Sequence, residues 1–142
     1  WVLPAERTKT GYEHRVPLAG RTKEILSQAK LLSMGSELIF ESPTTGRALS
    51  YNTLLHLLQK RIGSVATVHG FRSSFKDWAS ETTNFPNEVS EMALSHKITS
   101  SVEAAYRRGD LLEKRRELMA DWEEFLRNPD PKIVSLDFRA RG

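Results

Sequence analysis

The 142-residue chain contains no cysteine, which excludes a disulfide framework and thiol chemistry. It has no hydrophobic run of membrane-spanning length, and its first residues lack the pattern of a signal peptide. Internal repeats and low-complexity segments are also missing. Hydrophobic residues make up 39% of the chain and charged residues 27%, so length and composition predict one globular domain with a proper core.

Charge is distributed unevenly along the chain, whose net charge is +3. Residues 1–72 contain 10 lysines and arginines against 5 acidic residues, which is a net charge of +5. Residues 73–142 contain 11 against 13, which is −2. Mild basicity is compatible with a nucleic-acid partner, but many globular domains are equally basic, so charge alone selects no partner.

Four side chains between residues 69 and 106 carry the chemistry: His69, Arg72, His96 and Tyr106. The first two are three residues apart at the head of a helical pattern, so we expect them on one face. A guanidinium can hold two phosphate oxygens, an imidazole can move or share a proton, and a phenol can attack phosphorus. The set predicts a phosphate site. It contains neither a thiol nor a carboxylate cluster, so we expect no metal and no other cofactor.

The pattern of short extended segments and longer helical repeats predicts the fold class. Turn residues around Gly11 join two extended segments, 1–4 and 14–18, and predict a hairpin with Lys9 near its tip. Helical spacing of apolar residues follows at 20–32, 50–61 (with Ser50 as the N-cap), 70–82, 84–96 and 111–126. We therefore expect a mainly α fold with a small antiparallel β-hairpin, in the α+β class.

Two of the predicted helices have clear apolar stripes that we interpret as core. The helix at 70–82 carries an aromatic stripe, which we assign to packing and not to base stacking: Phe71, Phe75, Trp78 and Ala79. The last helix carries Leu111, Leu118, Met119, Trp122 and Phe125. A basic cluster on the same helix comprises Lys114, Arg115 and Arg116.

The order H-x-x-R, then L-x-H, then a tyrosine about ten residues later resembles the tyrosine recombinase, or phage integrase, family. The phrases HGFR, FPNEVSEMALSH and VEAAYRRGDLLEKRRELMADW are similar to its prophage-type integrases. The resemblance runs from residue 1 to about residue 126. It implies a tyrosine recombinase catalytic-domain fold, in which residues 1–127 are the C-terminal part of the catalytic domain and residues 128–142 are a tail.

The resemblance also implies a role for each candidate residue. Tyr106 would be the nucleophile that forms a 3′-phosphotyrosine, and His69 would accept its proton. Arg72 would clamp a non-bridging phosphate oxygen and His96 would hydrogen-bond the phosphate. The segment T-K-T-G resembles the family's hairpin, whose lysine, here Lys9, protonates the leaving 5′ oxygen. Taken alone, each residue has an ordinary structural role, such as a solvated turn lysine or a helix-capping histidine.

The sequence departs from the family pattern at two places. Ser95 stands where the family's L-G-H motif has glycine, which puts the turn geometry there in doubt. The family's second arginine, in a motif like L-R-x-S-E, has no match in residues 1–68. Because the chain starts at Trp1 without an initiator methionine, we expect a fragment that lacks this motif and is impaired when isolated.

The resemblance implies double-stranded DNA attachment sites as partners, self-assembly as a tetramer on DNA, and accessory DNA-bending proteins. It implies a location in the bacterial cytoplasm, with the nucleoid and not at a membrane. Three alternatives stay open: a non-enzymatic DNA-binding module in which Tyr106 and Lys9 are structural, a type IB topoisomerase-like enzyme without site specificity, and a metal-dependent nuclease that uses His69 and His96 as ligands.

Overall fold

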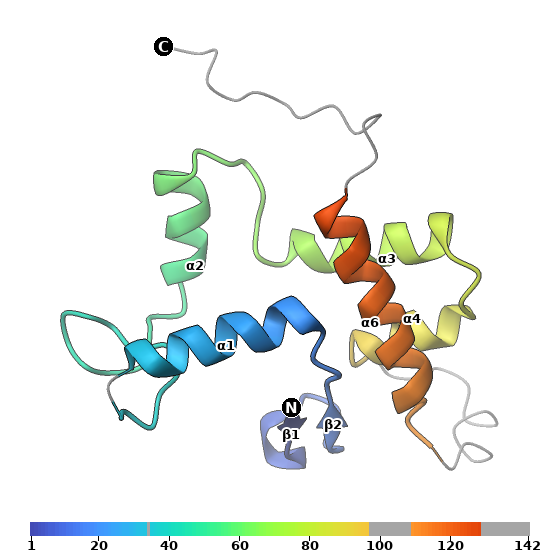
Figure 1. Ribbon diagram of the computed structural model, residues 1–142, viewed down its shortest axis with the longest axis horizontal. Helices are drawn as coiled ribbons and strands as arrows, with labels where there is room; N and C mark the ends of the chain where they lie inside the picture. The colour runs from blue at the N-terminus through green and yellow to red at the C-terminus, as the bar shows by residue number, and fades with distance from the viewer. Residues whose placement is uncertain (34, 97–108, 129–142) are drawn as a thin grey trace. The chain divides into compact units, whose positions relative to one another are not determined.

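The computed structural model describes residues 1–33, 35–96 and 109–128 (Figure 1). Its helices account for most of the regular structure, and one two-stranded antiparallel sheet lies near the N-terminus. The predicted mainly α fold with a small hairpin is confirmed. None of the described helices is both long and apolar enough to span a bilayer.

The hairpin consists of β1 (Val2–Leu3) and β2 (His14–Arg15), which pair antiparallel with Val2 opposite Arg15. A short 3-10 helix, η1 (Ala5–Arg7), lies in the connection between the strands. Thr8 holds the turn closed, because its hydroxyl donates to the Tyr12 carbonyl oxygen over 2.8 Å. The strands are brief because Pro4 and Pro17 flank them and a proline nitrogen cannot donate to a ladder.

The described residues divide into two compact units. The first unit combines residues 1–20 with residues 72–128, and the second contains residues 21–71. Helix α3 (Gly70–Thr82) begins at the end of the second unit and continues into the first. Its bounds are those predicted from the sequence. At its start the Thr67 hydroxyl accepts a hydrogen bond from the Gly70 amide (3.0 Å), which satisfies one of the amides that a helix start leaves unpaired.

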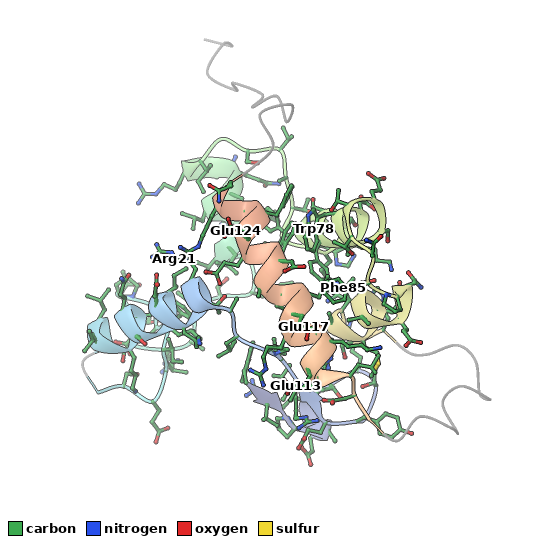
Figure 2. All side chains as sticks on the ribbon, turned by 45° about the vertical axis from the view of Figure 1, so that its right-hand side comes forward. Arg21, Trp78, Phe85, Glu113, Glu117 and Glu124 are labelled. Carbon is green, nitrogen blue, oxygen red and sulfur yellow. The ribbon has the colours of Figure 1, made fainter. Side chains whose placement is uncertain are left out.

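The first unit has an aromatic core between α3 and α6 (Leu112–Arg127). Trp78 lies beside α6 (Figure 2). The centroid of its ring is 4.9 Å from that of Trp122 and 5.7 Å from that of Phe125. Helix α4 (Asn87–Ala93) packs against α6 and contributes Val89. The buried hydrophobic set is Phe75, Trp78, Ala79, Val89, Leu94 and Leu118. These aromatics are packed in the core, as predicted, and Phe71 is exposed instead of joining them.

The second unit contains α1 (Gly20–Leu32) and α2 (Thr53–His56), which continues as one π-helical turn, η2 (Leu57–Arg61). Helix α2 begins three residues after the predicted cap. The Ser50 hydroxyl instead accepts a hydrogen bond from the Asn52 amide in the preceding turn (3.3 Å). Within residues 21–33 and 35–71, every hydrophobic side chain is exposed or half-buried.

Candidate phosphate site

Arg72 lies in the first turn of α3, and its guanidinium reaches the end of α4. The Nη2 atom donates to the Leu94 carbonyl oxygen over 2.6 Å and lies 2.9 Å from Nε2 of His96. Two residues that are 24 positions apart in the sequence therefore meet in space. A guanidinium beside an imidazole is suited to an anion with several oxygen atoms, such as a phosphate.

The turn that follows α4 fixes the backbone of His96. The His96 amide donates to the Glu91 carbonyl oxygen (3.0 Å) and the Ser95 amide to the Met92 carbonyl oxygen (3.1 Å). Ser95 has a φ of 56°, in the left-handed region. These two hydrogen bonds and this conformation form a Schellman motif, in which the residue in the left-handed position is most often glycine. Serine therefore occupies the glycine-favouring position of the L-x-H motif and retains the turn.

Glu91 holds the imidazole of His96 from the other side. The Oε2 atom of Glu91 lies 2.6 Å from Nδ1 of His96, and its Oε1 atom lies 2.8 Å from Nζ of Lys76. The pKa of Glu91 is lowered, first by the hydrogen bond from Lys76 and then by that with His96, so the carboxyl group stays ionised at neutral pH. Polar contacts between side chains therefore link Lys76 to Glu91, Glu91 to His96 and His96 to Arg72.

Sequence reasoning missed Lys76 and Glu91. Lys76 is four residues after Arg72 on α3, so helical spacing places the two side chains on one face. Glu91 is on α4, five residues before His96. Spacing could have placed Lys76 beside Arg72, but only the packing of α3 against α4 shows that Lys76 contacts Glu91.

A second polar cluster attaches the hairpin to the start of α6. The buried guanidinium of Arg115 donates to the Arg15 carbonyl oxygen (2.5 Å), to the Asp110 carbonyl oxygen (2.7 Å) and to the Asp110 carboxylate (2.8 Å). Arg15 also pairs with Asp110, at 2.7 Å. The pKa of Asp110 is lowered, chiefly by its hydrogen bond with Arg15. The cluster holds β2 against α6 and thereby positions the hairpin that carries Lys9.

Arg115, one of the three residues of the basic cluster on the last helix, is buried, with a side chain that is 1% exposed. The spacing of Arg115 in the sequence could have indicated this burial. Leu118, Met119 and Trp122 follow it by three, four and seven residues, which places Arg115 on the apolar stripe of the helix. A charge on a stripe of this kind is buried only with partners, and here Asp110 and two carbonyl groups supply them.

The remaining predicted site residues lie in different places. Lys9 is exposed in the turn between β1 and β2, in the same unit as Arg72 and His96. His69 is exposed and immediately precedes α3, in the second unit. Tyr106 lies outside the described residues. The structure therefore brings together Arg72 and His96, and the approach of the other three residues to this pair stays a prediction.

The sequence is similar to those of several integrases. It is 36% identical over 138 residues to prophage integrase IntA of Escherichia coli (strain K12), a match that covers 96% of this chain and 33% of that protein. Prophage integrase IntZ of the same organism is 31% identical over 122 residues, which are 84% of this chain and 30% of IntZ. The integrase of Enterobacteria phage P4 is 29% identical over 153 residues, a match that covers 96% of this chain and 35% of that integrase.

The chain spans about a third of the length of the curated relatives it matches. No protein-family model matches it, and no solved structure matches it.

Proposed function

We propose that this chain, which belongs to the phage and prophage integrase family, carries catalytic groups of a tyrosine-type site-specific DNA recombinase. Residues 1–127 would form part of its catalytic domain and residues 128–142 a tail. The pair of Arg72 and His96, with Nη2 and Nε2 only 2.9 Å apart, is the observation that supports this proposal most directly. It unites the arginine of the H-x-x-R motif with the histidine of the L-x-H motif.

The pair is suited to the transition state of phosphoryl transfer. Attack on a phosphodiester increases negative charge on the non-bridging oxygens, so a catalyst needs donors that are already oriented. The guanidinium of Arg72 is held by the Leu94 carbonyl group, and the ring of His96 is held by Glu91. The side chain of His96 is 45% exposed, so a phosphate of DNA can reach it from solvent.

The proposed reaction uses the phenol of Tyr106 as nucleophile. Its oxygen bonds to phosphorus while the bond from phosphorus to the 5′ oxygen breaks, which leaves a 3′-phosphotyrosine and a free 5′ hydroxyl. His69 accepts the phenol proton, and Lys9 donates a proton to the leaving oxygen. Rejoining reverses these steps, so the bond energy is conserved in the covalent intermediate and no nucleotide is consumed.

The partners of the proposed enzyme are those that the resemblance to tyrosine recombinases implies. It would act on double-stranded DNA attachment sites, as a tetramer with accessory DNA-bending proteins, in the bacterial cytoplasm. Lysines and arginines would bind the phosphate backbone with a strong dependence on salt. Such contacts position the protein on DNA, and base contacts would then select the attachment site.

The test is covalent adduct formation by the full-length integrase that contains this chain, on labelled attachment-site DNA in denaturing gels. Tyr106→Phe removes one oxygen and keeps the ring, so we expect no adduct and nearly unchanged DNA affinity. Tyr12→Phe is the matched control, because Tyr12 is exposed in the hairpin turn, and it should form the adduct normally. An adduct formed by Tyr106→Phe would overturn the assignment of the nucleophile.

Arg72→Ala tests the phosphate clamp in the same assay. Loss of one oriented donor should lower the rate of adduct formation by about two to three orders of magnitude. The control is Arg116→Ala, since Arg116 is exposed and pairs only locally with Glu113. Cleavage without any adduct and abolished by a chelator would favour the metal-dependent nuclease, and an adduct without site preference would favour the topoisomerase-like enzyme.

A further inference from the structure

The hydrogen bonds around His96 define where its proton lies. A guanidinium has only donors, so the 2.9 Å contact with Arg72 requires Nε2 of His96 to accept. The ring must then carry its proton on Nδ1, which donates to Oε2 of Glu91 over 2.6 Å. In this arrangement the Nε2 atom, which faces Arg72, has no proton to donate.

Lys76 occupies the other oxygen of Glu91. Its ammonium group donates to Oε1 of Glu91 (2.8 Å), to the Ser90 hydroxyl (2.8 Å) and to the Asn87 side-chain oxygen. These three acceptors use the three N–H bonds of the lysine, so its role is to hold Glu91 and not to bind a ligand. Each carboxylate oxygen of Glu91 thus has one fixed donor, and the carboxylate cannot turn away from His96 without losing both.

We propose that Glu91 is a positioning residue that sets the proton of His96 on Nδ1, and that phosphate binding at Arg72 and His96 is coupled to uptake of a proton by Nε2. The identity of the ligand as a DNA phosphate rests on the proposed function. A phosphate oxygen only accepts, so it needs a proton on Nε2. Moving the Nδ1 proton there would set a lone pair against the Glu91 carboxylate, so the second proton comes from water.

The charges that face His96 favour this coupling. Arg72 faces one ring nitrogen and Glu91 faces the other, with Lys76 behind Glu91. A proton on Nε2 would set two donors against each other in the contact with Arg72. A bound phosphate would replace this direct contact and accept from both side chains, and the Glu91 carboxylate would compensate the imidazolium. Protonation and phosphate binding therefore assist each other.

The first experiment needs no DNA. Nitrogen-15 NMR of the histidine rings in this chain at pH 8 should show His96 with its proton on Nδ1, and His96→Gln identifies the signal. Glu91→Gln should move the proton to Nε2, which breaks the contact of Nε2 with Arg72 and leaves the guanidinium on the Leu94 carbonyl oxygen. The amide has one acceptor oxygen, which the charged Lys76 takes, so its NH₂ group faces Nδ1. Glu81→Gln, at an exposed position on α3, is the control and should change nothing.

A double variant gives the decisive comparison. Lys76→Met combined with Glu91→Gln frees the amide oxygen for His96, so the proton should return to Nδ1. Damage to the fold would not be reversed by a second substitution in the same cluster. If wild-type His96 carries its proton on Nε2, or if Glu91→Gln leaves the tautomer unchanged, Glu91 does not position the ring.

The second experiment measures the coupling in the full-length integrase with Tyr106→Phe, which binds attachment-site DNA without cleaving it. Calorimetric titration near pH 8 in two buffers of different ionisation enthalpy should show uptake of about one proton that His96→Gln removes. Glu91→Gln should remove most of it, because its ring already has a donor at Nε2. Equal uptake in all three proteins would reject the coupling.

Failure of the proposed function and failure of the proposed role of Glu91 give different results. If the wild-type integrase forms no covalent adduct, the proposed function fails, but the tautomer result from NMR still decides whether Glu91 positions His96. If adduct formation depends on Tyr106 and the tautomer does not depend on Glu91, the proposed function stands and this inference is wrong.

Discussion

The two units of this chain differ in what holds their helices. In the first unit, α3, α4 and α6 share a buried core of aromatic and aliphatic side chains, and Arg115 adds a buried polar anchor. In the described part of the second unit, α1 contains no buried residue and neither does α2. Because helices in proteins gain most of their stability from packing, we expect the first unit to carry most of the free energy of unfolding.

The difference also bears on function. The Arg72 and His96 pair and the chain of charges behind it belong to the first unit, where the backbone is held by packing. Catalytic groups must be held close to their productive geometry, which requires rigid support. The proposed phosphate site therefore lies where the protein is most firmly packed, while His69 precedes α3 at the end of the less packed unit.

The largest expected effect comes from paired leucine truncations in the two units. Leu118→Ala removes a side chain that is 0% exposed in the first unit and should lower the free energy of unfolding by about 2–5 kcal/mol. Leu54→Ala, at a position on α2 that is 52% exposed, should change it by less than about 0.5 kcal/mol. Urea unfolding followed by tryptophan fluorescence measures both, and equal losses would contradict the comparison.

The next largest effect on the free energy of unfolding should come from removing the buried guanidinium of Arg115. Arg115→Met keeps an apolar stem in the stripe but leaves the Arg15 and Asp110 carbonyl groups without their donor. We expect a loss of about 1.5–3 kcal/mol in the free energy of unfolding, the usual range for hydrogen bonds to a charged group. Arg116→Met removes an exposed arginine from the same helix turn and should cost less than about 0.5 kcal/mol.

A third substitution should stabilise the first unit. Ser95→Gly relieves a left-handed backbone conformation that costs a non-glycine residue about 1–2 kcal/mol, against an entropic loss of about half that size. The net gain in the free energy of unfolding should be up to about 1 kcal/mol. If the glycine variant is less stable in urea unfolding, then Ser95 contributes a contact that outweighs the strain of its backbone.

The smallest expected effect is on the pH dependence of the free energy of unfolding. Burial, followed by the charge of Arg115, lowers the pKa of His14 from its ordinary value of 6.5. The unfolded chain therefore binds a proton on this ring at higher pH than the folded chain. The contribution of His14 to stability is fully present above pH 6.5 and decreases as pH falls through its folded pKa.

His14→Gln should flatten the stability profile in that window without changing its shape above pH 7. Urea unfolding at several pH values between 8 and 5 measures the two profiles. A profile that is as steep in the variant as in the wild type would show that another group causes the acid sensitivity of the first unit.

Predictions made from local patterns were the most accurate. The bounds of α3 match those predicted, because its apolar stripe has helical spacing and Thr67 caps its start. The hairpin was predicted from two short extended segments and the turn residues between them. By contrast, Phe71 was assigned to the core because it continues the stripe of α3, yet it is exposed, since the stripe meets α6 only from Phe75 onward.

The candidate site was predicted as a set of residue types in a fixed order, without its supporting contacts. The family resemblance named Arg72 and His96, and their catalytic role stays a prediction. It did not name Glu91 or Lys76, because their role depends on which charged side chains become neighbours when α3 packs against α4. The spacing of Arg115 on the apolar stripe could have predicted its burial, but its contact with the Arg15 carbonyl group depends on packing.

The positions of the main helices, the hairpin and the order of the chemical groups could be predicted, because these depend on signals within a few residues. The packing of the helices brings Arg72 to His96, lets Glu91 accept from both His96 and Lys76, and supplies the partners of the buried Arg115. Contacts between residues 15 to 100 positions apart arise from the packing of whole elements against one core, and no local pattern encodes that packing.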